Sequence, residues 1–266
     1  MNWPNILAFD FDGVICDGLV EYFQTAWKAY CQIWNPTPSV PPKGLAERFY
    51  PLRPVIETGW EMPMLLRSLL LGVTDEEVLA DWQAIAHRRI DAEGLNPVDL
   101  ARAVDGVRDE WIREDTDEWL AQHRFYPGVI ARLRRCLEEV DQCVIISTKE
   151  GRFIQTLLER EQVAIAPESI YGKEVRQPKH ETLRQLTAQY QETTAGTPQL
   201  WFIEDRLKTL ESVKEQADLD HVTLFLADWG YNTEGDRDRA AQGDRLHLLT
   251  SDIFAKDFDA WVAGHP

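Results

Sequence analysis

Short apolar runs alternate with helical patterns in this 266-residue chain, and this alternation limits the folds available to it. The runs occupy residues 6–9, 143–146, 200–203, 221–225 and 246–249. Apolar runs of this length are typical of strands buried on both faces. Helical patterns such as 151–160 and 179–190 separate the later runs. Because alternating strands and helices form parallel βαβ units, we predict an α/β fold with a doubly wound parallel sheet.

A long region without strand patterns separates the first apolar run from the second. In this region 74–77 read as a helix capping box, and Asn96-Pro97 as a helix cap followed by a first-turn proline. Prolines at positions 51, 54 and 63 are expected to divide the middle of this region into short pieces. We therefore predict an all-helical subdomain over residues 17–123, inserted into an α/β core formed by residues 1–16 and 124–266.

The charge and composition of the chain exclude several classes of partner. The formal net charge is −17 and the pI is near 4.8, so most of the surface repels nucleic acids and anionic membranes. No apolar run reaches the length of a membrane span or a signal peptide core. The cysteines lack metal-ligand spacing and are read as reduced thiols; they stand at positions 16, 31, 136 and 143. We expect a cytoplasmic protein that binds neither nucleic acid nor a membrane.

Polar side chains follow three of the predicted strands. They are Asp10 and Asp12, Ser147 and Thr148, and Glu204 and Asp205. The carboxyl ends of parallel strands meet at one edge of the sheet, so these groups are expected to converge. Two carboxylates about 4 Å apart repel by roughly 4 kcal/mol at an effective dielectric constant of 20. The cluster therefore requires cations, for which Mg²⁺ and Lys179, at a helix start, are the candidates.

Several motifs of the chain resemble those of the haloacid dehalogenase superfamily, in its phosphoglycolate phosphatase-like branch with a helical cap. The matching segments are residues 9–14, 144–149, Lys179 and 202–205, together with 125–129 and 228–231. The resemblance covers residues 1–16 and 124–255, and the cap matches only in position and helical character.

The resemblance implies a role for each acidic residue. Asp10 would be the nucleophile that forms an aspartyl-phosphate, and it would also be a ligand of the metal. The main-chain carbonyl of Asp12 would bind Mg²⁺, and its side chain would act as general acid and then as general base. Asp205 would hold the metal, with Glu204 contributing directly or through water.

The resemblance also implies residues that bind the phosphoryl group. Ser147 would bond a phosphoryl oxygen, aided by main-chain N–H groups near Thr148. Lys179 would neutralise charge on Asp10 and on the phosphoryl group. The family usually has Lys-Pro here and this chain has Pro178-Lys179, so Lys173 stays open as an alternative.

The implied activity is Mg²⁺-dependent hydrolysis of a small phosphorylated metabolite. A phosphomutase shares the same motifs, and a non-catalytic sensor of a phosphorylated metabolite is a further alternative. Arginines of the cap are candidates to hold a second anionic group of the substrate, with an ordinary surface position as the alternative; they are Arg48, Arg53 and Arg67. The sequence does not indicate an oligomeric state.

Overall fold

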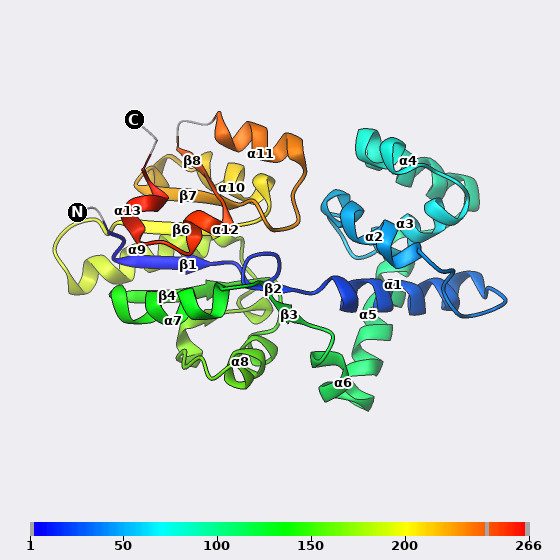
Figure 1. Cartoon of the computed structure of the whole chain (residues 1–266), viewed down its shortest axis with the longest axis horizontal. Helices are drawn as coiled ribbons and strands as arrows, with labels where there is room; N and C mark the ends of the chain where they lie inside the picture. Colours follow the sequence, from blue (N-terminus) through cyan, green and yellow to red (C-terminus); the bar gives the residue numbers. More distant parts are fainter. Residues whose placement is uncertain (1–2, 243–244, 264–266) are drawn as a thin grey trace. The chain divides into compact units, whose positions relative to one another are not determined.

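The chain divides into two compact units in a computed structural model that describes residues 3–242 and 245–263 (Figure 1). One unit consists of Met1–Asp17 and Arg124–Pro266 and is called the core unit below. The other, Gly18–His123, is called the helical unit. This division lies one residue from the predicted boundary between core and cap.

A parallel sheet forms the centre of the core unit. Within the described residues it has six strands in the order β5-β4-β1-β6-β7-β8. These strands are β1 (Ile6–Phe9), β4 (Gln142–Ile146), β5 (Ile170–Tyr171), β6 (Leu200–Glu204), β7 (Val222–Ala227) and β8 (Leu246–Leu249). Each neighbouring pair is parallel, which confirms the predicted doubly wound α/β sheet.

Helices cover both faces of this sheet because successive strand residues point to opposite sides. The helices of the core unit are α7 (Val129–Glu139), α8 (Gly151–Arg160), α9 (Lys179–Thr193), α10 (Leu207–Lys214), α11 (Glu234–Ala241), α12 (Ser251–Phe254) and α13 (Phe258–Trp261). Ile6 and Ala8 share an apolar cluster with side chains of α9, α10 and α11. Phe9 faces the other way and contacts Phe254 of α12 edge to face.

A short antiparallel pair of strands, which the sequence did not predict, joins the two crossings of the chain between the units. It consists of β2 (Cys16–Asp17) and β3 (Arg124–Phe125). Cys16 pairs with Phe125, and Asp17 pairs with Arg124. The pair brings the two ends of the insertion together within the core unit.

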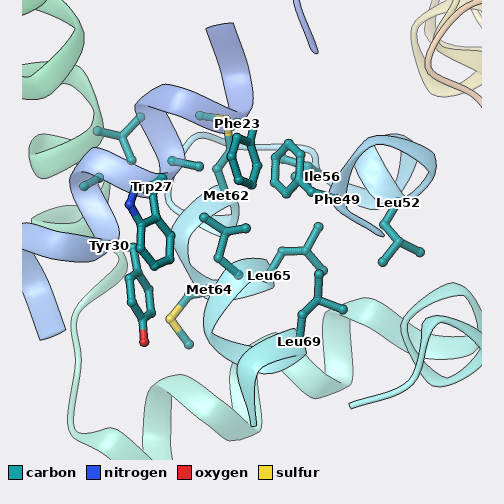
Figure 2. Packing of buried hydrophobic residues seen from close by; sticks show 14 of the residues in the cluster. Phe23, Trp27, Tyr30, Phe49, Leu52, Ile56, Met62, Met64, Leu65 and Leu69 are labelled. Carbon is teal, nitrogen blue, oxygen red and sulfur yellow. The ribbon is translucent and has the colours of Figure 1, made fainter. Parts of the chain in front are cut away.

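The helical unit has an apolar core of its own. Its helices are α1 (Leu19–Trp34), α2 (Leu45–Leu52), α3 (Glu61–Leu70), α4 (Asp75–Glu93), α5 (Pro97–Glu114) and α6 (Thr116–Leu120). Figure 2 shows Phe23 and Trp27 of α1, Phe49 of α2 and Leu65 of α3 among the side chains of this core. The predicted capping box holds, because the side chains of Thr74 and Glu77 each bind the other residue's main-chain N–H.

The prolines at 51 and 63 do not divide the region as predicted. Pro63 is the third residue of α3, where a helix makes no use of the N–H that proline lacks. Pro51 lies inside α2, in its last turn, and Pro54 lies in a 3₁₀ helix, Arg53–Val55.

Two of the cap arginines proposed to hold an anion are already paired. Arg48 Nη2 lies 2.6 Å from Asp75 Oδ1, and Arg67 Nε lies 3.0 Å from Glu93 Oε1. The guanidinium of Arg53 lies over the ring of Tyr22. All three contacts lie within the helical unit and give each of these arginines a structural partner there.

Of the helices within residues 3–242 and 245–263, none combines the length and the apolar character needed to cross a bilayer.

Candidate active site

The three polar strand ends lie side by side because β1 is paired with β4 on one side and with β6 on the other. Phe9, the last residue of β1, is level with Ile145 of β4 and Ile203 of β6. Asp10 therefore follows β1 at the height where β6 ends in Glu204, and Ser147 follows β4 next to them. The predicted convergence at one sheet edge thus follows directly from the strand order.

Lys179 connects two of the carboxylates. It is the first residue of α9, and its Nζ lies 2.8 Å from Asp10 Oδ1 and 2.7 Å from Glu204 Oε2. Asp10 Oδ1 also accepts a 2.7 Å hydrogen bond from the N–H of Phe11. Lys173, the alternative, is exposed and contacts the neighbourhood through its main chain, which donates to the carbonyl of Lys149. The structure therefore places Lys179, rather than Lys173, on the predicted nucleophile.

Burial makes the carboxylates of this edge unusually weak acids. It raises the pKa of Asp10 to about 7; repulsion by Glu204 adds to the rise, and Lys179 opposes it. Burial and the charge of Asp10 raise the pKa of Asp205 to about 6. Burial works against the charge of Lys179, but Asp10 and Glu204 outweigh it and raise the pKa of the ammonium group. Lys179 therefore stays positively charged at this edge, and it offsets only part of the negative charge of the acids around it.

Asp205 is held closely by the main chain around it. The N–H of Tyr231 donates a 2.7 Å hydrogen bond to Asp205 Oδ2. Gly13 and Gly230 leave room for the side chain, because a Cβ at either position would overlap atoms of Asp205. The other oxygen, Oδ1, is buried and meets no hydrogen-bond donor within the described residues. A buried carboxylate oxygen without a donor is costly unless a cation binds it.

The donor set fits a divalent cation that prefers oxygen ligands. Asp10, Glu204 and Asp205 each offer an oxygen atom, and the three atoms lie within 4.8 Å of one another. Glu204, however, already accepts from Lys179 and, through Oε1, from the N–H of Arg206. Asp10 and Asp205 are therefore the better direct ligands, and Glu204 supports Lys179 instead.

Negative charge exceeds positive charge among the side chains of the site. The acids are Asp10, Asp12, Glu204 and Asp205, and the nearby cations are Lys149, Lys179 and Arg206, whose guanidinium lowers the pKa of Asp205. A bound cation would offset this excess, and Mg²⁺ is held by carboxylates and carbonyl oxygens in proteins.

Asp12 and Ser147 lie close to the same loop after β4. Lys149 Nζ is 3.3 Å from Asp12 Oδ1, and both side chains are mostly buried. Ser147 is buried, and its Oγ accepts a 3.2 Å hydrogen bond from the N–H of Lys149. Thr148, which lies between Ser147 and Lys149 in the chain, is exposed. The predicted acid–base side chain and the predicted phosphate-binding hydroxyl are thus both contacted by one residue, Lys149.

Sequence reasoning missed the contacts of Lys149, Tyr231 and Gly230 with the predicted site residues. Lys149 belongs to the motif at 144–149, whose predicted role rests on Ser147 and Thr148. Tyr231 and Gly230 belong to the segment 228–231, which had been singled out without a role. The signal that could have identified the segment 228–231 is its place directly after β7, at the same sheet edge as Asp205.

Comparison with known proteins identifies the fold. No family model matches the sequence, and no curated protein matches it. A candidate phosphoglycolate phosphatase from Lactobacillus delbrueckii superposes with a TM-score of 0.59 at 13% identity, covering 94% of this chain and 95% of that chain. A predicted phosphatase from Clostridium acetobutylicum gives 0.56 at 14% identity, covering 94% of both chains. A haloacid dehalogenase-like hydrolase from Streptococcus pneumoniae gives 0.54 at 13% identity, covering 94% and 95%. The chain therefore has the fold of the haloacid dehalogenase-like hydrolases, as its motifs indicated.

Proposed function

We propose that the protein is a Mg²⁺-dependent phosphatase that hydrolyses a small phosphorylated metabolite through an aspartyl-phosphate on Asp10. The observation that carries the proposal is the contact of Lys179 with Asp10 beside Asp205, whose buried Oδ1 meets no hydrogen-bond donor in the part of the chain that the structure describes. A fixed ammonium group and a vacant carboxylate oxygen next to a nucleophilic carboxylate are the parts that phosphoryl transfer requires. The shared fold with proteins described as phosphatases supports the same reaction class.

Asp10 has one oxygen suited to attack. Both of its contacts, with Phe11 N–H and with Lys179 Nζ, use Oδ1. Oδ2 is left to attack the phosphorus atom, while Lys179 holds the carboxylate in place and offsets the negative charge of the phosphoryl oxygens. When bound by Asp10, Asp205 and the main-chain oxygen of Asp12, Mg²⁺ would neutralise the charge on these carboxylates and on the phosphoryl group.

Asp12 and Ser147 complete the proposed chemistry. The Asp12 carboxyl would give a proton to the leaving oxygen of the substrate and would later take one from the water that attacks the aspartyl-phosphate. Ser147 Oγ accepts the N–H of Lys149, so its own O–H is available to donate to a phosphoryl oxygen. Several such groups must act together, because phosphate-monoester hydrolysis requires accelerations that approach 10²¹.

The direct test is phosphate release from a broad panel of phosphorylated metabolites, measured with Mg²⁺ and with EDTA. We expect release from one compound or a small group of compounds in Mg²⁺, and its loss in EDTA. Isomerised products without phosphate release would identify a mutase instead. Binding of a panel compound without any turnover would identify a sensor, and either result would overturn the proposal.

A further inference from the structure

Asp205 is contacted by three consecutive residues of the segment after β7. The Cα of Gly230 packs against the Asp205 side chain so closely that a Cβ at this position would overlap Asp205 Cβ. The N–H of Tyr231 binds Oδ2 of Asp205. Asn232 Nδ2 donates a 3.1 Å hydrogen bond to the main-chain oxygen of Asp205. The segment therefore fixes both the main chain and the carboxylate of the proposed metal ligand.

Asn232 joins this segment to the sheet through its side chain. Its side chain is 5% exposed, and Nδ2 also donates a 2.8 Å hydrogen bond to the carbonyl of Ala227, the last residue of β7. One amide group thus binds the carbonyls that follow β6 and end β7. Removing it would leave two buried carbonyl groups without this donor and would free the segment that carries the Tyr231 N–H.

Arg237 determines which way the Asn232 amide points. Arg237 Nη1 donates to Asn232 Oδ1 at 3.1 Å and to the Asn232 carbonyl at 3.2 Å. Since a guanidinium group has no acceptor, the oxygen of the amide must face Arg237 and the nitrogen must face the two carbonyls. Arg237 lies on α11, which begins with a capping box between Thr233 and Asp236.

We propose that Asn232, oriented by Arg237, is a positioning residue for the cation site, acting through Asp205. By fixing the main chain of Asp205 and the N–H that occupies Oδ2, it leaves Oδ1 as the oxygen offered to the cation. Partners of this kind, one shell away from a metal ligand, change metal affinity by about 10- to 100-fold when they are removed. The proposal rests on the cation site of the proposed function, but it does not depend on the substrate or on the chemical step.

The test measures Mg²⁺ affinity directly. Metal-free protein is titrated with Mg²⁺, and the dissociation constant is taken from tryptophan fluorescence and from the thermal midpoint. Trp229 makes fluorescence a suitable probe, because it is next to Gly230 and its Nε1 donates to the carbonyl of Val14. We expect Asn232→Leu to weaken Mg²⁺ binding by about 10- to 100-fold. Arg237→Met is expected to weaken it by a smaller factor, since Arg237 acts only through Asn232.

Two comparisons separate a positioning role from general destabilisation. Thr250→Ala removes the N-cap of α12, whose oxygen accepts the N–H of Ile253, and it lowers stability without a contact to Asp205. Its Mg²⁺ affinity should equal that of the wild type. In activity assays, Asn232→Leu should raise the Mg²⁺ concentration for half-maximal activity while kcat at saturating Mg²⁺ changes much less. Arg237→Met keeps the test decisive if Asn232→Leu does not fold.

Three results would overturn the inference. Unchanged Mg²⁺ affinity in both variants would show that the network does not position Asp205. Equal loss of affinity in Thr250→Ala would assign the effect to stability alone. A wild-type protein that binds no divalent cation would remove the cation site from the proposed function, and this failure is distinguishable because it appears without any substitution.

Discussion

Buried carboxylates occur in both units of the molecule, but their surroundings differ. In the helical unit Glu21 is 2% exposed, and both of its oxygens accept hydrogen bonds from Arg108, with Thr25 and Trp119 adding further donors to Oε1. At the sheet edge of the core unit, Asp205 is buried to the same degree, but among residues 3–242 and 245–263 a donor reaches only one of its oxygens. The negative charge of Glu21 is thus offset by donors of its own unit, whereas the negative charge of Asp205 and its acidic neighbours is offset only in part.

The comparison distinguishes a buried carboxylate that stabilises the fold from buried carboxylates that favour the binding of a cation. Burial disfavours the charge of Arg108, yet Glu21 outweighs it and raises the pKa of the guanidinium group, so that pair is stable as it stands. At the sheet edge, repulsion between Asp10 and its neighbours adds to the cost of burial. Such a site is stabilised by a ligand of opposite charge, which the chain itself does not provide.

The largest effect should come from removing the proposed nucleophile. We expect Asp10→Asn to reduce phosphate release by at least about 10³-fold, because the amide cannot form the aspartyl-phosphate. The same change removes one of the mutually repelling acids, so the thermal midpoint in EDTA at pH 8 should not fall. Turnover and circular dichroism melts measure the two effects.

The matched control is Asp91→Asn, the same change at an exposed residue of α4. It should alter neither property. Wild-type turnover by Asp10→Asn would refute the nucleophile assignment, and a strongly lowered midpoint would show that Asp10 serves folding as Glu21 does.

The next effect concerns the compensated acid of the helical unit. Glu21→Gln leaves the mostly buried Arg108 without its counter-charge and should lower the free energy of unfolding by about 2–4 kcal/mol. Glu110→Gln breaks an exposed pair with Arg113 and should cost less than about 0.5 kcal/mol. Urea unfolding of both variants measures the difference, and equal costs would contradict the contrast drawn between the two units.

The pH dependence of stability should report the acids at the sheet edge. Folded Asp10 and Asp205 have pKa values of about 7 and about 6, against 3.8 for an ordinary aspartate. The folded state therefore keeps protons that the unfolded chain releases. Their contribution to stability is complete below pH 3.8 and is lost as the pH rises through these folded values. Metal-free protein should lose stability between about pH 4 and pH 7.

Mg²⁺ should reverse this loss. At a concentration 100 times its dissociation constant, it should add about 2.7 kcal/mol at pH 8. Asp205→Asn isolates the contribution of Asp205, because it should reduce the loss of stability with pH to the part due to Asp10 and abolish the gain from Mg²⁺. A pH profile identical to that of the wild type would argue against the raised pKa of Asp205.

The smallest effect should come from a substitution away from both the Glu21–Arg108 pair and the acids at the sheet edge. Gly106 lies exposed in the middle of α5, and a Cβ there would meet nothing within 4 Å. Gly106→Ala should stabilise the protein by about 0.5–1 kcal/mol through helix propensity. Phosphate release should stay at the wild-type rate. A decrease in activity would mean that the stability of α5 limits function, contrary to the separation described above.

Much of the fold and the choice of candidate residues followed from the sequence, because both depend on short patterns. Apolar runs identified β1, β4, β6, β7 and β8, but not the two-residue strand β5. The rule that parallel strands end at one edge of the sheet predicts from the sequence alone that Asp10, Ser147 and Asp205 lie together. The caps at Thr74 and Asn96 were predictable because their hydrogen bonds join residues two or three apart.

The missed features depend on contacts that have no local pattern. Lys149 meets Asp12, and Asn232 meets Asp205, across loops far apart in the chain. The tight packing of Gly13 and Gly230 on Asp205 is equally invisible in their own neighbourhoods. The pair β2–β3 was missed because strands of two residues give no periodicity.

The pairing of β2 with β3 has an evolutionary consequence. Asp17, where the chain leaves the core unit, lies opposite Arg124, where it returns, and paired residues in antiparallel strands are about 5 Å apart. For the core unit, the whole segment 18–123 is thus equivalent to the loop of a hairpin. The entropy of closing such a loop grows only with the logarithm of its length. Insertions of other sizes and folds could therefore replace this one while the strand order stays the same, so that selection can vary the inserted module and the catalytic edge independently.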